Sequence, residues 1–360
     1  MSSLTFIFPH IATGPTGGYK VVYEYANRLA NDGVEVHIVY SGSIYWSRKP
    51  LRFKLSNIVR YVQTLLRGYS ARRWFPLDRR VKEHLTFSMN YRHMPKTDIY
   101  VATSPYTADY LNDYPIHTAN KFYFIQDKED WGPGLNAILE KTYQMQLQKI
   151  VISQWLMRML LLNYNEPSTL VPNGFDFESF KQTIDPEDKD KYCISMMYHS
   201  MERKRCVDAI EALKIVKKSY PALRVKVFGV PSCPSGLPEW FTYYQTPDID
   251  THNRINNEAA IYVGSSAVEG WGLTVGEAMI CGQAVCCTDI DGYKEMACDR
   301  QTALLSPVMD PEALAKNIIA LIEDDELRIR IAHSGNEFIQ RFRWDDSYRK
   351  FRKTLHLNQA

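Results

Sequence analysis

Short apolar runs alternate with helical patterns along the whole chain. In the first half, apolar runs occupy 4–8, 34–39, 99–102, 122–125 and 150–152, and apolar residues recur at helical spacing over 21–31. In the second half, runs at 194–198, 225–228, 260–263, 284–287 and 303–305 alternate with helical patterns at 206–219, 274–281 and 311–323. Strands that alternate with helices predict parallel sheets with helical crossovers. We therefore predict an α/β fold made of two similar Rossmann-like halves.

The stretch 176–191 separates the two halves. It is polar and charged and shows little periodicity, as in Asp185-Pro186-Glu187-Asp188-Lys189. Such composition is typical of a connection between domains. We expect a first domain at 1–175 and a second at 190–340, with the ligand crevices of both sheets facing one another across a cleft.

Residues 45–95 break the alternation. They carry twelve Lys or Arg but only Asp78 and Glu83 as acids, interleaved with aromatic residues. Within them, apolar residues from Leu55 to Leu66 form a helical stripe flanked by Arg60 and Arg67. A basic amphipathic segment suits an anionic membrane surface or a phosphate-bearing acceptor. The alternative is a solvated helix that packs on its domain through the stripe.

Composition and charge narrow the classes of protein. The chain has 360 residues, of which 45% are apolar, and its net charge is +2, so it is neither disordered nor of collagen type. The first 180 residues hold 20 basic and 15 acidic residues, so the first half of the chain has a net positive charge. No motif for nucleic acid accompanies this charge, and no nucleic-acid partner is expected.

Cysteine usage and the N-terminus predict a cytoplasmic protein. All seven cysteines lie in the second half without a CxxC pair, so we expect buried thiols rather than disulfides or a metal site. The chain contains no apolar run of about 18 residues, so no membrane span is predicted. Its first residues lack the basic region of a signal peptide.

The strongest chemical signal is the stretch from Glu269 to Met279, Glu-Gly-Trp-Gly-Leu-Thr-Val-Gly-Glu-Ala-Met. It follows a strand and opens a helix, so it lies at the carboxyl edge of a sheet. Gly270 and Gly272 let the backbone approach a ligand, and the N–H groups near Leu273 and Thr274 suit a diphosphate. Glu277 can grip a ribose diol, although Thr274-x-x-Glu277 also matches a capping box.

Two glutamates separated by seven intervening residues in this context resemble the signature of the retaining glycosyltransferases of family 4. Three further segments are similar to that family: Gly17-Gly18 before the first helix, Pro172-Asn173-Gly174-Phe175-Asp176, and the turn from Asp289 to Glu295. The resemblance implies a GT-B fold, with a C-terminal helix at 341–360 that crosses back to the first domain. It also implies transfer of a hexose from a nucleotide diphosphate sugar to an acceptor hydroxyl, with retention of configuration.

The resemblance assigns roles to individual residues. Glu277 would bind the ribose, Glu269 the transferred sugar, and Gly17, Gly18 and the backbone of Gly270, Trp271, Gly272, Leu273 and Thr274 the rest of the donor. Lys204 matches the lysine that neutralises the leaving diphosphate. The arginine expected beside it is replaced by His199, so Arg203 or Arg205 would substitute. The alternative for Arg203-Lys204-Arg205 is an exposed helix start.

On the acceptor side the family often has a His-Asp pair, where this chain has Gln126-Asp127. Gln126 can only hydrogen-bond, so Asp127 is the candidate for a polar or catalytic role, with a helix N-cap as the alternative. His10 follows a strand end and could reach the same place.

No metal and no cofactor are expected, because side-chain cations can neutralise the leaving group and the nucleotide sugar is a substrate. Asp248-Ile249-Asp250 and Asp289-Ile290-Asp291 show the spacing of manganese-dependent transferases, a triplet that is common by chance. The expected partners are a nucleotide sugar, a saccharide or lipid-linked acceptor, and an anionic membrane surface bound through 45–95 at the inner face of the membrane. The acceptor suggests polysaccharide or glycolipid biosynthesis. A sugar-nucleotide epimerase and a non-catalytic sugar-nucleotide-binding protein remain as alternatives.

Overall fold

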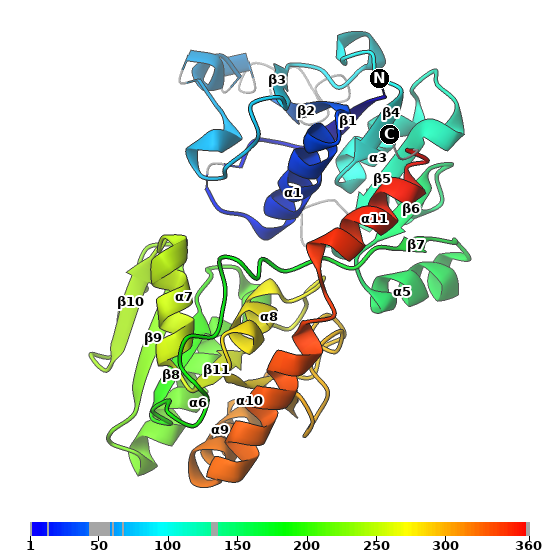
Figure 1. Ribbon diagram of the computed structural model, residues 1–360. Helices are drawn as coiled ribbons and strands as arrows, with labels where there is room; N and C mark the ends of the chain where they lie inside the picture. Colours follow the sequence, from blue (N-terminus) through cyan, green and yellow to red (C-terminus); the bar gives the residue numbers. More distant parts are fainter. Residues whose placement is uncertain are drawn as a thin grey trace. The chain divides into compact units, whose positions relative to one another are not determined.

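The computed structural model describes residues 2–12, 14–42, 58–59, 61–66, 68–130 and 136–357. The chain forms two compact units: the first comprises 1–172 and 345–360, and the second comprises 173–344. Each unit has a parallel sheet with helices packed on it (Figure 1). The chain enters the second unit after Pro172, so 176–191 lies within that unit.

The first unit has a seven-stranded sheet in the order β3-β2-β1-β4-β5-β6-β7. Its strands are β1 (Ser3–Phe8), β2 (Glu35–Ser41), β3 (Lys82–Thr86), β4 (Ile99–Ala102), β5 (Lys121–Ile125), β6 (Gln148–Val151) and β7 (Thr169–Leu170). Its α-helices are α1 (Gly17–Asn31), α3 (Pro105–Asn112), α4 (Asn136–Tyr143), α5 (Gln154–Tyr164) and α11 (Trp344–Thr354), which begins in the second unit. The strand order reverses between β1 and β4, which places a ligand crevice at the carboxyl ends of these strands.

The second unit has a six-stranded sheet in the order β10-β9-β8-β11-β12-β13. Its strands are β8 (Cys193–Met197), β9 (Arg224–Gly229), β10 (Phe241–Gln245), β11 (Ile261–Gly264), β12 (Ala284–Thr288) and β13 (Ala303–Ser306). Its α-helices are α6 (Cys206–Ser219), α7 (Ile249–Glu258), α8 (Leu273–Ile280), α9 (Pro311–Glu323) and α10 (Asp325–Ile339). The order reverses between β8 and β11, so the loops after these two strands border the crevice of this unit.

The core of each unit follows from the apolar runs. Strand residues such as Phe6, Val101 and Phe124 in the first unit, and Ile194 and Val263 in the second, are almost fully buried. Strands buried on both faces read as continuous apolar runs, which is why the sequence revealed them. The C-terminal helix α11 joins the first core through Phe351, whose ring stacks on Tyr25 at 4.1 Å.

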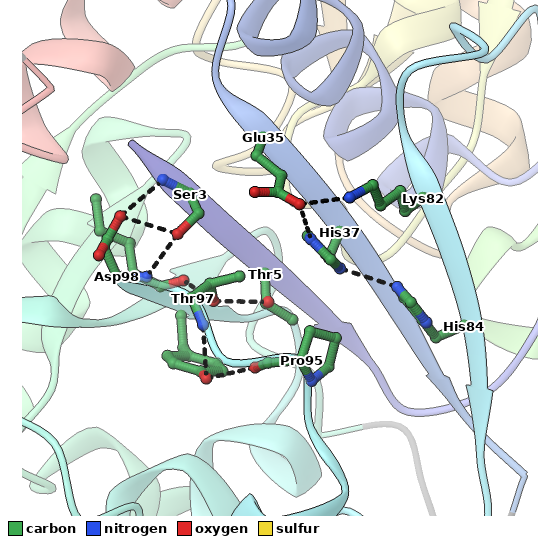
Figure 2. A network of polar contacts seen from close by, with 11 residues as sticks. Ser3, Thr5, Glu35, His37, Lys82, His84, Pro95, Thr97 and Asp98 are labelled. Atoms are coloured by element: carbon green, nitrogen blue, oxygen red, sulfur yellow. Dashed lines mark hydrogen bonds and ion pairs between the residues drawn. The ribbon is translucent and has the colours of Figure 1, made fainter. Parts of the chain in front are cut away.

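A polar network occupies the opposite, amino edge of the first sheet (Figure 2). The rings of His37 on β2 and His84 on β3 lie nearly parallel, with 2.9 Å between His37 Nδ1 and His84 Nε2. Glu35 accepts from His37 Nε2 at 3.2 Å and from Lys82. Burial, His37 and Lys82 lower the pKa of His84. The hydrogen bond between the two rings joins the edge strand β3 to β2, and two protonated rings would repel one another.

The basic segment 45–95 is only partly described, and six of its basic residues lie outside the described residues: Arg48, Lys49, Arg52, Lys54, Arg60 and Arg67. Residues 58–59 and 61–66 are helical. Tyr61 contacts Phe87 with ring centroids 5.2 Å apart. The apolar residues of this stretch face solvent, with exposed fractions from 37% to 83%: Ile58, Val59, Val62, Leu65 and Leu66. The alternative that the stripe packs on the domain is therefore wrong for these residues.

The rest of that segment is anchored to the first unit. Ala12 O accepts from Tyr69 OH at 2.8 Å and from Trp74 Nε1 at 3.2 Å. Glu83 on β3 accepts from Ala71 N at 2.8 Å and from Arg72 NH1 at 2.5 Å. These bonds hold 69–74 against the loop that follows β1, at the carboxyl edge of the sheet.

Candidate active site

Helix α8 begins at Leu273, directly after the loop that leaves β11. Its N-cap is Gly272 with φ +96°, and a Cβ there would lie 2.7 Å from the ring of Tyr293. Both facts require glycine. The first N–H groups of a helix have no intrahelical acceptor and carry the positive end of its dipole. The loop Gly270–Trp271–Gly272 and the first turn thus form a site suited to a phosphate group.

The capping-box alternative for Glu277 is wrong. Gly272, not Thr274, is the N-cap, and it makes no side-chain capping bond. Thr274 Oγ1 instead accepts from Tyr262 OH at 2.7 Å. Glu277 lies inside the helix and is 8% exposed. Glu277 is therefore a buried carboxylate about one helical turn from the phosphate site.

Glu269 and Lys204 lie together at the carboxyl edge of the second sheet. Glu269 Oε1 accepts from Lys204 Nζ at 2.5 Å and from Ser266 Oγ at 2.7 Å. Both partners of the ion pair are largely buried, with side-chain exposures of 15% for Lys204 and 12% for Glu269. A lysine ammonium beside a phosphate-binding helix terminus can neutralise a leaving diphosphate.

Backbone contacts fix this pair. Ser265 Oγ donates to Lys204 O at 3.1 Å, and Ala267 N donates to Arg203 O at 2.8 Å, so the loops after β8 and β11 are joined. A Cβ on Gly292 would lie 2.1 Å from the carbonyl oxygen of Glu269. Only glycine therefore permits the close approach of the loop after β12.

The other candidates in the loop after β8 differ in what they offer. His199 Nδ1 accepts from Met201 N at 3.0 Å, and burial, together with Lys204, lowers the pKa of His199. His199 is therefore neutral at pH 7 and does not replace an arginine as a cation. Arg205 donates to both oxygens of Asp208 at 2.8 Å, so its charge is committed at the start of α6.

Arg205 also occupies the left-handed region, with φ +47°. Glycine adopts this conformation without strain, whereas a residue with a side chain does not. Trp271 is 3% exposed and packs against Phe175 and Phe342, so its backbone rather than its indole faces the crevice.

In the first unit, Gly17 and Gly18 open α1 after β1. Gln126, after β5, donates from Nε2 to Gly18 O at 3.0 Å. Within the described residues Gln126 Oε1 is buried without a partner, so an acceptor remains for a ligand hydroxyl. Asp127 accepts from Lys128 N at 2.8 Å, and 128–130 are not helical, so the N-cap alternative for Asp127 is wrong. His10 is bound to Tyr19, at 3.1 Å between Nδ1 and the phenol oxygen.

The two D-x-D triplets have structural explanations. Asp248 caps α7 by accepting from Thr251 N at 2.8 Å. Asp289 forms an ion pair with Lys294 at 2.6 Å. Within the described residues, no group of three or more His, Cys, Asp or Glu side chains could hold a metal ion.

Sequence reasoning missed the residues that support the site. Ser266 holds Glu269, Thr288 Oγ1 donates to Ser266 O at 2.6 Å, and Tyr262 holds Thr274. All three are strand or strand-end residues whose apolar neighbours dominate the pattern. The sequence shows Gly292 only as part of a turn, because its contact with Glu269 is formed by two loops that the fold brings together.

Comparison with known proteins finds a family match in the second unit. Residues 176–338 match the family model described as glycosyl transferases group 1. A phosphatidyl-myo-inositol mannosyltransferase of Mycobacterium tuberculosis is 23% identical over 222 residues, 58% of this chain and 59% of that protein. The chain thus spans about three fifths of the length of the curated relatives it matches.

Two solved structures show the fold of the whole chain. Sucrose-phosphate synthase from Thermosynechococcus elongatus has a TM-score of 0.72 at 14% identity and covers 99% of this chain and 98% of its own. Anabaena Alr3699/HepE, solved in complex with UDP and glucose, has a TM-score of 0.72 at 14% identity and covers 99% of this chain and all of its own. These likenesses confirm the predicted GT-B class of two α/β units with parallel sheets.

Proposed function

We propose that the chain is a retaining glycosyltransferase that moves a hexose from a nucleotide diphosphate sugar to an acceptor hydroxyl. The observation that carries this proposal is the juxtaposition of Lys204, Glu269 and the N-terminus of α8 at the carboxyl edge of the second sheet. The match to glycosyl transferases group 1 over this unit supports it.

The proposed donor site uses each group by its chemistry. The first turn of α8 binds the diphosphate, and Glu277 accepts from the ribose hydroxyls. Glu269 accepts from hydroxyls of the transferred sugar. Lys204, paired with Glu269, donates to the diphosphate as negative charge develops on the leaving group. Arg203 is the second candidate cation, since the charge of Arg205 is committed to Asp208.

The first unit is proposed to supply the acceptor side. Gly18 and Gln126 lie at the carboxyl edge of its sheet, where Gln126 Oε1 can accept from a sugar hydroxyl. Asp127 is the ionisable group nearest along the chain. It is proposed to hold the acceptor hydroxyl, while the leaving phosphate takes its proton in a front-face attack.

A thermal-shift screen tests the donor proposal. UDP, GDP, ADP and dTDP sugars are added to the wild type, Glu277→Gln and the matched control Glu312→Gln, an exposed residue of α9. We expect one donor class to stabilise the wild type and the control, and Glu277→Gln to lose most of that shift. Stabilisation by none of the donors, or equal shifts in all three proteins, would contradict the proposal.

We further propose that the apolar stripe of 58–66 and its basic surroundings bind an anionic membrane surface, where a lipid-linked acceptor would lie. The exposure of Leu65 and Leu66 supports this, at 51% and 83%. None of the described helices is both long and apolar enough to cross a bilayer. Co-sedimentation with vesicles of anionic lipid should fall for Leu66→Glu and stay unchanged for Leu162→Glu on α5, a residue of similar exposure at 78%. Equal binding by both variants would exclude this surface.

A non-catalytic sugar-nucleotide-binding protein is the second candidate, favoured by the neutral His199 in place of a cation. An epimerase would instead isomerise a bound donor without an acceptor. Release of a nucleoside diphosphate from the bound donor excludes the first alternative, and recovery of an unchanged donor sugar excludes the second.

A further inference from the structure

Lys189 is a buried lysine away from the phosphate-binding loop. Its side chain is only 6% exposed. Its Nζ donates to three backbone carbonyl oxygens, at 2.7 Å to Cys281, 3.1 Å to Asn256 and 3.3 Å to Ala259. Burial of an ammonium without a carboxylate is costly, so three carbonyl partners need an explanation.

The three carbonyls belong to the C-terminal ends of two helices. Asn256 lies in the last turn of α7 and Ala259 is the C-cap of that helix. Cys281 is the C-cap of α8. Helix C-termini carry partial negative charge and unsatisfied carbonyl groups, and a cation there stabilises both. The ammonium therefore lies at the negative end of the helix whose opposite end forms the proposed diphosphate site.

We propose that Lys189 is a positioning residue of the donor site, which fixes the C-terminal ends of α7 and α8 and strengthens diphosphate binding at the N-terminus of α8 through its charge. This inference rests on the proposed function. Lys189 does not touch the donor, because eight helical residues of about 1.5 Å each separate the two ends.

Coulomb's law gives the size of the effect. Unit charges about 15 Å apart at an effective dielectric constant of about 20 change an affinity by roughly sixfold before salt screening. The additional charge of a diphosphate strengthens the attraction to Lys189, and solvent in the crevice weakens it. We therefore expect loss of the Lys189 charge to weaken binding about three- to tenfold.

Raising the pH removes the positive charge of Lys189. Burial lowers its pKa to about 8, so the ammonium is lost as the pH rises from 7 to 9. The ionisable groups that act on it are the thiols of Cys281 and Cys193, and burial raises the pKa of both, that of Cys281 to about 12. In the donor loop, His199 has a lowered pKa and is neutral throughout this range.

Calorimetric titration of the full chain with UDP, GDP and ADP at pH 7 and pH 9 tests the inference. We expect the wild type to bind one of these nucleotides three- to tenfold more weakly at pH 9 than at pH 7. Lys189→Arg, which stays charged, should bind equally at both pH values. Lys189→Met should bind weakly at both. Any titration of the nucleotide itself affects the variants and the wild type alike. The pH profile of each variant is therefore the baseline for the wild type.

Lys191→Met is the matched control. Lys191 lies two residues away and pairs with Asp325 at 3.1 Å, so its loss should leave the wild-type profile intact. If neither Lys189 variant folds, the wild-type profile decides after correction for the titration of the free nucleotide between pH 7 and 9. The inference is overturned if the wild-type affinity stays constant or rises between pH 7 and 9, or if it falls equally in Lys189→Arg. In either case, nucleotide binding at pH 7 still upholds the donor site. If none of the nucleotides binds at pH 7, the proposed function fails with it.

Discussion

Gly292→Ala should separate the geometry of Glu269 from the stability of the second unit. A Cβ at this position would lie 2.1 Å from the carbonyl oxygen of Glu269 and 3.0 Å from its Cβ. Ordinary contact needs about 3.5 Å, so the loop of Glu269 must move by roughly 1 Å. That shift breaks the geometry of a carboxylate held by Lys204 and Ser266.

Two magnitudes follow. Overpacking of this kind lowers the free energy of unfolding by about 1–3 kcal/mol. Misplacement of a substrate-contacting group by about 1 Å lowers transfer by about 100-fold. Urea unfolding measures the first, and release of nucleoside diphosphate from the donor measures the second. Loss of turnover should therefore greatly exceed any loss of folded protein at the assay temperature.

Gly335→Ala is the control within the same unit. A Cβ there would lie 3.3 Å from Met279 Cγ and 3.3 Å from the backbone oxygen of Thr302, and Gly335 lies inside α10. These slightly tight contacts offset the gain in helix propensity, so alanine should change the free energy of unfolding by less than about 1 kcal/mol and leave turnover unchanged. Wild-type turnover and stability in Gly292→Ala would refute the proposed role of this contact.

Three further predictions concern the edges of the sheets. Acidification below the usual pKa of histidine should destabilise the fold around His37 and His84, because the lowered pKa of His84 makes the unfolded chain bind more protons than the folded chain. The protection of the β3 amides against exchange, corrected for the slower intrinsic exchange at low pH, should be weaker at pH 5 than at pH 7, and a His84→Gln variant with the same loss of protection would contradict this. Arg205→Gly should keep donor affinity and change the free energy of unfolding by less than about 1 kcal/mol. The reason is that relief of the left-handed backbone strain offsets the lost ion pair with Asp208. A large loss of donor affinity in titrations would show that the guanidinium reaches the donor. Glu83→Ala should lower the free energy of unfolding by about 2–3 kcal/mol and expose 69–74 to proteolysis, since four donors, from Tyr40, Ser70, Ala71 and Arg72, lose their acceptor; an unchanged digestion pattern would argue against anchoring by β3.

The buried strands were predictable from the sequence, whereas the edge strands β3, β7 and β10 were not. β1, β5, β8 and β11 are continuous apolar runs because both of their faces are covered. β3 reads Lys-Glu-His-Leu-Thr, and its polar side chains are satisfied by neighbours such as Glu35 and Arg72 that only the fold brings near. A strand held by polar contacts has no apolar run to reveal it.

The candidate site was predictable where it is local and not where it is assembled. The loop Gly270–Gly272 and the start of α8 lie within one short stretch, so their spacing alone indicated a phosphate site. The pairing of Lys204 with Glu269 joins loops 65 residues apart. Lys189 stood in a charged run that favoured an exposed connection, because sequence does not show that two helix ends meet there.

Proton NMR of donor hydrolysis tests the central claim most directly. The nucleotide sugar that stabilises the protein is incubated with it, and the anomeric proton of the released sugar is followed before mutarotation. We predict release of a nucleoside diphosphate together with a sugar that first appears in the configuration it had in the donor, and loss of this release in Lys204→Ala. First appearance of the opposite anomer, or equal release by Lys204→Ala, would contradict a retaining transferase built on this site.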